Sequence, residues 1–175
     1  MLTILHWTIL GVALLRASEL IYANRNTQRL LSNGGIEYGR NHYPLFVLLH
    51  GSWLLAIFLL APVNSPVVPS IFAAFVFLQL ARFWVITSLG PYWTTRIISS
   101  PNFPIVLCGP YRWVKHPNYV IVSAEIATLP LSFGAWEIAL IFSFLNAILL
   151  WYRIRIESAA LAERRRIITK PVLNS

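Results

Sequence analysis

Residues 119–152 read YVIVSAEIATLPLSFGAWEIALIFSFLNAILLWY, two apolar stretches at about 119–132 and 135–152 that only Leu131-Ser132-Phe133-Gly134 separates. A connection this short joins helices that run antiparallel and side by side. The segment therefore predicts a tight helical hairpin. Such a hairpin brings the start of its first helix next to the end of its second.

Three further apolar stretches lie upstream, at about 2–22, 44–62 and 67–89. Each has the roughly 20 residues needed to cross about 30 Å of hydrocarbon. Hydrophobic residues make up 57% of the chain and charged residues only 11%, less than half the share usual in soluble domains. Backbone groups in lipid must be hydrogen-bonded internally, and no alternating barrel pattern occurs. We expect an all-α polytopic membrane bundle of about five transmembrane helices, one domain over residues 1–175.

The basic residues divide the connections into two groups. They cluster in segments 23–43, 90–117 and 153–175, and are missing from the amino end and from the turns at 62–69 and 131–134. Five spans put all the basic segments on one side. By the positive-inside rule, the amino end is outside and the carboxyl end is cytoplasmic, in the cell membrane. The first stretch lacks a positive n-region and a small-residue cleavage site, so we interpret it as a retained span.

Composition argues against several classes of function. The net charge of +8 is explained by topology and by anionic lipid headgroups, so we expect no nucleic-acid partner. Cys108 is the single cysteine, the chain has no aspartate, and the histidines show no metal-ligand spacing, so we expect no metal. No nucleophile motif or glycine-rich phosphate loop is present. The four histidines are His6, His42, His50 and His116.

A few charged residues fall inside the spans. Arg16 and Glu19 are three residues apart and so share a helical face, and Arg82 lies in the third span. Charged residues within a membrane suggest a functional site. A structural ion pair, or snorkelling toward the interface, is the favoured explanation for each of them.

Two polar segments remain, on the side we expect to be cytoplasmic: GPYRWVKHPNY (109–119) and WYRIRIESAALAERRR (151–166). The hairpin should place His116 and Tyr119 near Arg153 and Glu157, which share one helical face. This gathers a cation, an imidazole, a phenol and a carboxylate. The alternative is a helix start at Pro117 together with a positive-inside anchor and an i,i+4 salt bridge.

These segments resemble the isoprenylcysteine carboxyl methyltransferase family of integral-membrane enzymes. Gly109-Pro110-Tyr111 and His116-Pro117-Asn118-Tyr119 are similar to its first motif, with Lys115 in place of the usual arginine. Arg153-Ile154 and Glu157 are similar to its second, with Ser158 where a second glutamate is common. The resemblance covers about residues 90–165. Lysine keeps the charge of arginine but not its bidentate geometry.

The resemblance implies S-adenosylmethionine as cofactor and a lipophilic or prenylated acceptor that enters from the bilayer. It implies that Arg153 faces the acceptor, that Arg96 is a weaker candidate for the polar end of the cofactor, and that Arg153 and Glu157 are catalytic. The implied cofactor contacts are Phe103, Pro104, Ile105, Val106, Tyr111, His116, Pro117, Asn118, Tyr119 and Glu157.

The amino half is similar to a bacterial branch of the family that methylates alkylpyrone or alkylresorcinol oxygens made by type III polyketide synthases. Segments 18–26, 34–37 and 42–44 carry this likeness, which implies a functional link to such a synthase. We therefore expect an O-methyltransferase for a lipid-like acceptor. A phenol acceptor would need a base, with His116 and Glu157 as candidates.

Two alternatives stay open at this point. A phospholipid-type N-methyltransferase would need acidic residues around its acceptor, and the sequence offers few. A non-catalytic carrier should show broken or polar helices at the membrane midplane, whereas these polar residues gather at one face. A scaffold is distinguished by failure to bind S-adenosylmethionine.

Overall fold

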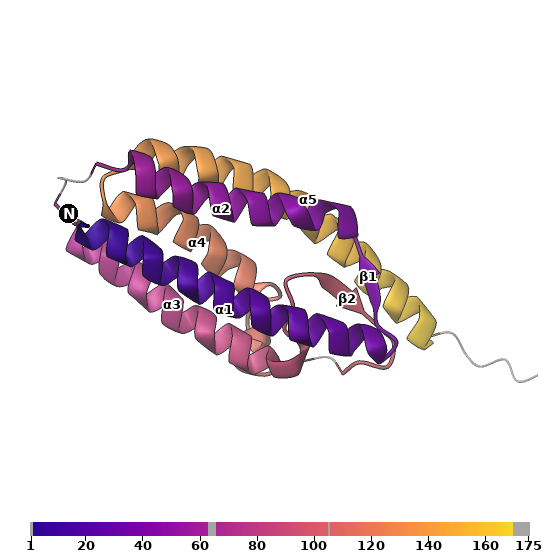
Figure 1. The fold of residues 1–175 in the computed structure, drawn as a ribbon. Coiled ribbons are helices and arrows are strands. Elements are labelled where there is room, and N and C mark those ends of the chain that lie inside the picture. Colours follow the sequence, from indigo (N-terminus) through magenta and orange to yellow (C-terminus); the bar gives the residue numbers. More distant parts are fainter. Residues whose placement is uncertain (1, 63–65, 105, 170–175) are drawn as a thin grey trace, which may run out of the picture.

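The computed structural model describes residues 2–62, 66–104 and 106–169, with side chains up to Ala162. The described chain is a bundle of five α-helices with a two-stranded sheet at one end (Figure 1). The helices are α1 (Ile4–Ser32), α2 (Tyr43–Leu60), α3 (Pro69–Leu89), α4 (Pro117–Ser132) and α5 (Trp136–Thr169). The strands are β1 (Ile36–Tyr38) and β2 (Ile97–Ser99), and short 3₁₀ turns cover Arg40–His42, Gly90–Tyr92 and Gly109–Arg112. The expected all-α membrane bundle is confirmed.

Four of the helices are long and apolar enough to cross a membrane: those that cover Ile4–Ser32, Arg40–Leu60, Pro69–Tyr92 and Trp136–Ala162. Large apolar side chains such as Leu14, Leu48, Phe77 and Phe144 are exposed on their outer surfaces. In water this would be a costly surface, but in a bilayer it faces lipid. The outward residues therefore mark the protein as membrane-integral.

Two helices differ in length from the expected spans. α1 was expected to end near residue 22, yet it continues to Ser32, since no glycine or proline interrupts residues 23–32. α4 has 16 residues, about 24 Å at 1.5 Å per residue, so it is shorter than a membrane is thick. Its first turn, which begins at Pro117, therefore lies part-way along the bundle, well before the Ser32 end of α1 (Figure 1). This leaves room for a cavity beneath it.

The connections sort to two ends of the bundle. The start of α1, the end of α2, the start of α3 and the α4–α5 turn lie at one end, and the two strands lie at the other (Figure 1). The α4–α5 turn is the predicted tight hairpin, closed by Gly134 at a φ of +72°. At the strand end, β1 and β2 pair antiparallel with Glu37 opposite Ile98, which joins the 33–42 and 90–116 connections. We call this the sheet end.

The apolar core occupies the end away from the sheet. It joins α1, α2, α3, α4 and α5 through Leu5, Ile9, Val12, Trp53, Ile57, Ala61, Phe75, Val122, Ile126, Leu129, Phe133, Ala135 and Ile138. Thirteen buried residues form this cluster, which fixes the five helices relative to one another. The sheet end is instead hollow.

Candidate active site

A cavity of about 870 Å³ opens at the sheet end and extends into the bundle. Its outer part is walled by residues of the 92–99, 103–104 and 106–119 segments and by α5, and its inner part by α1 and α2. The inner wall is mainly apolar and small, with Ala13, Ala17 and Leu20 on α1 facing Val47, Gly51 and Leu54 on α2. The volume lies in the range that holds a cofactor or a drug-sized ligand.

Tyr119 connects the two motif segments through its hydroxyl. The hydroxyl donates to Glu157 Oε2 at 2.6 Å and accepts from Arg153 Nε at 2.8 Å. The expected i,i+4 pair on α5 is therefore bridged by a phenol from α4, and a direct Arg153–Glu157 ion pair is not among the contacts of the described residues. The helical hairpin brings these three groups together, as the sequence indicated.

Arg153 is a buried cation with an unusual set of partners. Its side chain is 8% exposed, and its Nη2 donates to the Thr95 carbonyl oxygen at 2.8 Å. The guanidinium carbon lies 5.2 Å from the Phe46 ring centroid and 5.6 Å from that of Tyr119. No carboxylate pairs with it within the described part of the chain, and Nη1 makes no hydrogen bond there. A buried charge without a counter-ion is energetically costly, so a ligand with a negatively charged group would be stabilised beside Arg153.

His116 and Asn118 each carry a buried polar atom without a hydrogen-bond partner in the described chain. His116 Nε2 and Asn118 Oδ1 are buried without a hydrogen bond in the described chain, and both residues line the cavity. The His116 ring stacks on Tyr119 at 5.1 Å, and its Nδ1 lies 3.5 Å from Glu157 Oε2. Buried polar atoms are normally satisfied, so these two indicate a bound polar ligand.

The loop before α4 closes the outer side of the cavity. Phe103, Pro104, Val106 and Tyr111 line it, as does Pro117, whereas Ile105 lies outside the described residues. Burial, with the charge of Glu157 as a second cause, raises the pKa of the Tyr111 phenol, which therefore stays protonated near neutral pH.

The glycine of the first motif has a structural role. Gly109 has a φ of +56°, and a Cβ there would collide with the Ser88 side chain of α3. A larger residue would push the 103–111 loop away from the cavity.

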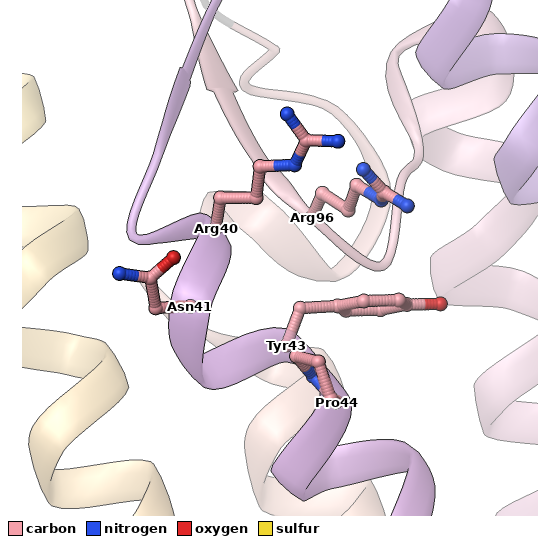
Figure 2. Close-up of a pocket in the computed structure, with 5 residues that line it drawn as sticks. All are labelled: Arg40, Asn41, Tyr43, Pro44 and Arg96. Atoms are coloured by element: carbon pink, nitrogen blue, oxygen red, sulfur yellow. The ribbon is translucent and has the colours of Figure 1, made fainter.

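Arg96 lies at a second, shallower hollow of about 350 Å³ that shares Tyr43 and Arg96 with the main cavity. Figure 2 shows the Arg96 guanidinium above the Tyr43 ring, with Arg40 beside it. Arg96 pairs with Glu37 at 3.2 Å and its guanidinium carbon lies 4.8 Å from the Tyr43 ring centroid. Its charge is thus compensated, unlike that of Arg153.

Several cavity residues were not foreseen from the sequence. Tyr43, Phe46 and His50 come from α2, and Thr95 from the segment before β2. The residues of α2 have spacings of three and four, so they lie on one helical face. His50, a polar residue inside an apolar span, was the one local signal for this face.

The charged residues inside the spans form one network. Arg16 pairs with Glu19 at 2.8 Å and with Glu125 at 3.1 Å, and Arg82 pairs with the same two carboxylates at 2.8 and 3.3 Å. The sequence indicated a structural ion pair for Arg16 and Glu19, but Glu125 of α4 was missed. The two arginines and two glutamates balance, so the network ties α1, α3 and α4 together without needing an added ion.

A bundle of apolar helices around a cavity with unsatisfied polar atoms defines a membrane-integral protein with an internal binding site. Residues 70–163 match the model of the isoprenylcysteine carboxyl methyltransferase (ICMT) family. This match spans more than half of the chain, which therefore belongs to that family and is a membrane methyltransferase. The members of the family use S-adenosylmethionine.

Two curated relatives match almost the full chain. One is YpbQ of Bacillus subtilis (strain 168), an uncharacterized protein that is 37% identical over 162 residues, or 90% of this chain and 96% of that protein. The other is an uncharacterized protein of Haemophilus influenzae (strain ATCC 51907 / DSM 11121 / KW20 / Rd), 26% identical over 160 residues, or 89% and 93% of the two chains. No solved structure matches the chain significantly.

Proposed function

We propose that the chain is an S-adenosylmethionine-dependent O-methyltransferase that acts on a lipid-like acceptor, either an alkylpyrone- or alkylresorcinol-type polyketide or an isoprenylcysteine carboxylate. The observation that carries this proposal is Arg153, a buried cation in the cavity with no carboxylate partner in the described chain. An anionic or acidic acceptor oxygen would compensate this charge. An amine acceptor would be repelled by it, which disfavours N-methylation.

The outer part of the cavity fits the cofactor. His116 Nε2 and Asn118 Oδ1 are among the buried atoms without partners, and Glu157 Oε1 makes no hydrogen bond in the described chain. These atoms would hold the polar groups of S-adenosylmethionine, against a wall formed by Phe103, Pro104 and Val106. Ile105 and Arg96 stay candidates for the same site. When bound, the cofactor supplies a methyl group, whose bond to sulfur breaks as the bond to the acceptor oxygen forms.

The residues of the chain position and polarise the acceptor. Arg153 Nη1 would orient the acceptor oxygen and stabilise its negative charge, while Tyr119 holds the guanidinium in place through its hydrogen bond to Nε. A carboxylate acceptor is already ionised. A hydroxyl acceptor must lose its proton, for which His116 and Glu157, 3.5 Å apart, are the candidate bases.

The position in the membrane follows from the charges. We infer that the sheet end, where the basic connections gather, faces the cytoplasm at the cell membrane. The water-soluble cofactor would enter there, and the acceptor tail would enter between α1 and α2 from the bilayer. The cavity uses all five helices, so residues 1–175 would act as one domain. For a polyketide acceptor, a type III polyketide synthase would supply the substrate.

The proposal is tested by calorimetric titration of S-adenosylmethionine into detergent-purified protein. Wild type should bind, and Glu157→Ala and His116→Ala should each weaken binding about tenfold or more, because hydrogen bonds to charged groups are lost. Glu137→Ala is the matched control: this exposed glutamate lies on the same helix at the opposite end of the bundle. Its affinity should be unchanged.

A folded wild type that binds no S-adenosylmethionine would overturn the proposal. A carrier or scaffold would then be the better interpretation. Folding is checked separately by circular dichroism and by elution as a single species.

A further inference from the structure

His50 lies in the inner part of the cavity, with one ring nitrogen in a hydrogen bond and the other without one in the described chain. Its Nδ1 lies 2.8 Å from the Phe46 carbonyl oxygen, which can only accept, so Nδ1 carries the proton. In the neutral ring Nε2 is then a bare acceptor. Within the described chain, Nε2 makes no hydrogen bond, and His50 lines the cavity. His50 therefore presents an unpaired hydrogen-bond acceptor on the cavity wall.

The surroundings of His50 are polar but neutral overall. Arg16, Glu19 and Arg82 line the same part of the cavity and, with Glu125, form the balanced ion network. Most of the guanidinium donors of Arg16 and Arg82 already bind carboxylates or Gln79. A polar headgroup is favoured over hydrocarbon beside these charged side chains, whereas the apolar residues of the inner wall accommodate a tail. The open lone pair of His50 is the group there that a neutral donor would satisfy.

His50 is also placed at a defined depth relative to Arg153. The Arg153 guanidinium lies against Phe46, and His50 follows Phe46 by four residues on the same helix. At 1.5 Å per residue this is about 6 Å, one helical turn further into the bundle. An acceptor headgroup can therefore reach Arg153 with one oxygen and His50 with another group.

We propose that His50 Nε2 accepts a hydrogen bond from a second hydroxyl of the acceptor headgroup, distinct from the oxygen that faces Arg153. This inference rests on the proposed function and narrows its substrate class to headgroups with two oxygens, of which the inner one is a donor. The tail then continues between α1 and α2, past Ala13, Ala17 and Gly51. His50 is a specificity residue in this scheme.

The test compares two probes that differ by one hydroxyl, 5-pentadecylresorcinol and 3-pentadecylphenol. Their dissociation constants are measured by calorimetry with and without S-adenosylhomocysteine, for wild type and for His50→Phe. Wild type should bind the resorcinol about tenfold more tightly than the phenol, because the second hydroxyl satisfies a buried acceptor. His50→Phe should lose this preference through weaker binding of the resorcinol alone.

The control is His6→Phe, which makes the same chemical change outside the cavity. His6 packs against Phe58 and its Nδ1 is bonded within the first turn of α1. It should keep the wild-type preference. Melting temperatures of both variants separate binding effects from loss of fold.

A full preference for the resorcinol in His50→Phe would overturn the inference, as would equal binding of the two probes by wild type. Failure of the proposed function has another signature, since S-adenosylhomocysteine would then not bind. The comparison of probes without it would still report on His50.

Discussion

Tyr119 is the residue on which the arrangement of the candidate site depends. Its hydroxyl accepts from Arg153 and donates to Glu157, so one oxygen holds both charged groups of α5 in position. The aromatic ring also stacks on the His116 imidazole and makes a cation–π contact with the Arg153 guanidinium. Loss of the hydroxyl would free both charged side chains.

Tyr119→Phe should therefore lower methyl transfer about tenfold to hundredfold while the fold is kept, because each hydrogen bond to a charged group is worth about 1.5–3 kcal/mol. Turnover on the preferred acceptor is the measurement. Tyr152→Phe is the matched control, since Tyr152 lies on α5 directly before Arg153 but is exposed. A Tyr119→Phe variant with wild-type turnover would show that the hydroxyl bridge is not used in catalysis.

The meeting of Tyr119, Arg153 and Glu157 was predictable from the sequence, because a short hairpin leaves little freedom in which ends of its helices meet. The contacts that other parts of the chain make with Arg153 were not predictable in this way. Phe46 and Thr95 contact Arg153 only because α2 and the segment before β2 pack against α5. That packing depends on tertiary contacts that no local pattern encodes.

At the scale of elements, hydropathy locates the membrane but not the ends of helices. α1 runs ten residues past the end of its apolar stretch, and Asn26 there is buried, donating to the Trp93 and Gly90 carbonyl oxygens. Helices stop at breakers, whereas apolar stretches stop at the interface. The strands were missed for a different reason, since three residues each are too short for an alternating pattern.

The pair of helices α1 and α2 yields a prediction about acceptor entry. Gly51 lines the cavity, and a Cβ built on it meets no atom within 4 Å, so it borders open space. Gly51→Leu should fill this space and lower kcat/KM for a long-chain acceptor about tenfold, with S-adenosylmethionine affinity unchanged. Leucine is also the better helix former by about 1 kcal/mol, so α2 should not be weakened.

Gly11→Leu is the control for this substitution. Gly11 is also helical and exposed, with no atom within 4 Å of a built Cβ, but it does not line the cavity. Steady-state kinetics of the two variants decide the matter. If both lower kcat/KM equally, the α1–α2 face is not the entry route for the acceptor.

At the scale of the whole molecule, the bundle has a packed end and a hollow end. The packed end holds the core from Leu5 to Ile138, and the hollow end holds the cavity and the strands. The short α4 produces this division, because its first turn begins inside the bundle and leaves the cavity beneath it. The sorting of basic connections to the hollow end was evident from the sequence. The cavity itself was not evident from the sequence, because it exists only since α4 is shorter than the other helices of the bundle.

Cys108 allows the orientation of the whole molecule to be measured at a native residue. It is the single cysteine of the chain, it is exposed, and it lies in the connection before α4 at the sheet end. If the positive-inside rule holds here, a membrane-impermeant maleimide should label it in inverted membrane vesicles but not in intact spheroplasts.

The control is Ser70→Cys in a Cys108→Ser background, because Ser70 is exposed in the first turn of α3, which begins at the opposite end of the bundle (Figure 1). It should react in spheroplasts only. Labelling of Cys108 from outside would place the cavity on the outer face, where the cell does not supply S-adenosylmethionine, and would contradict both the orientation and the route proposed for the cofactor.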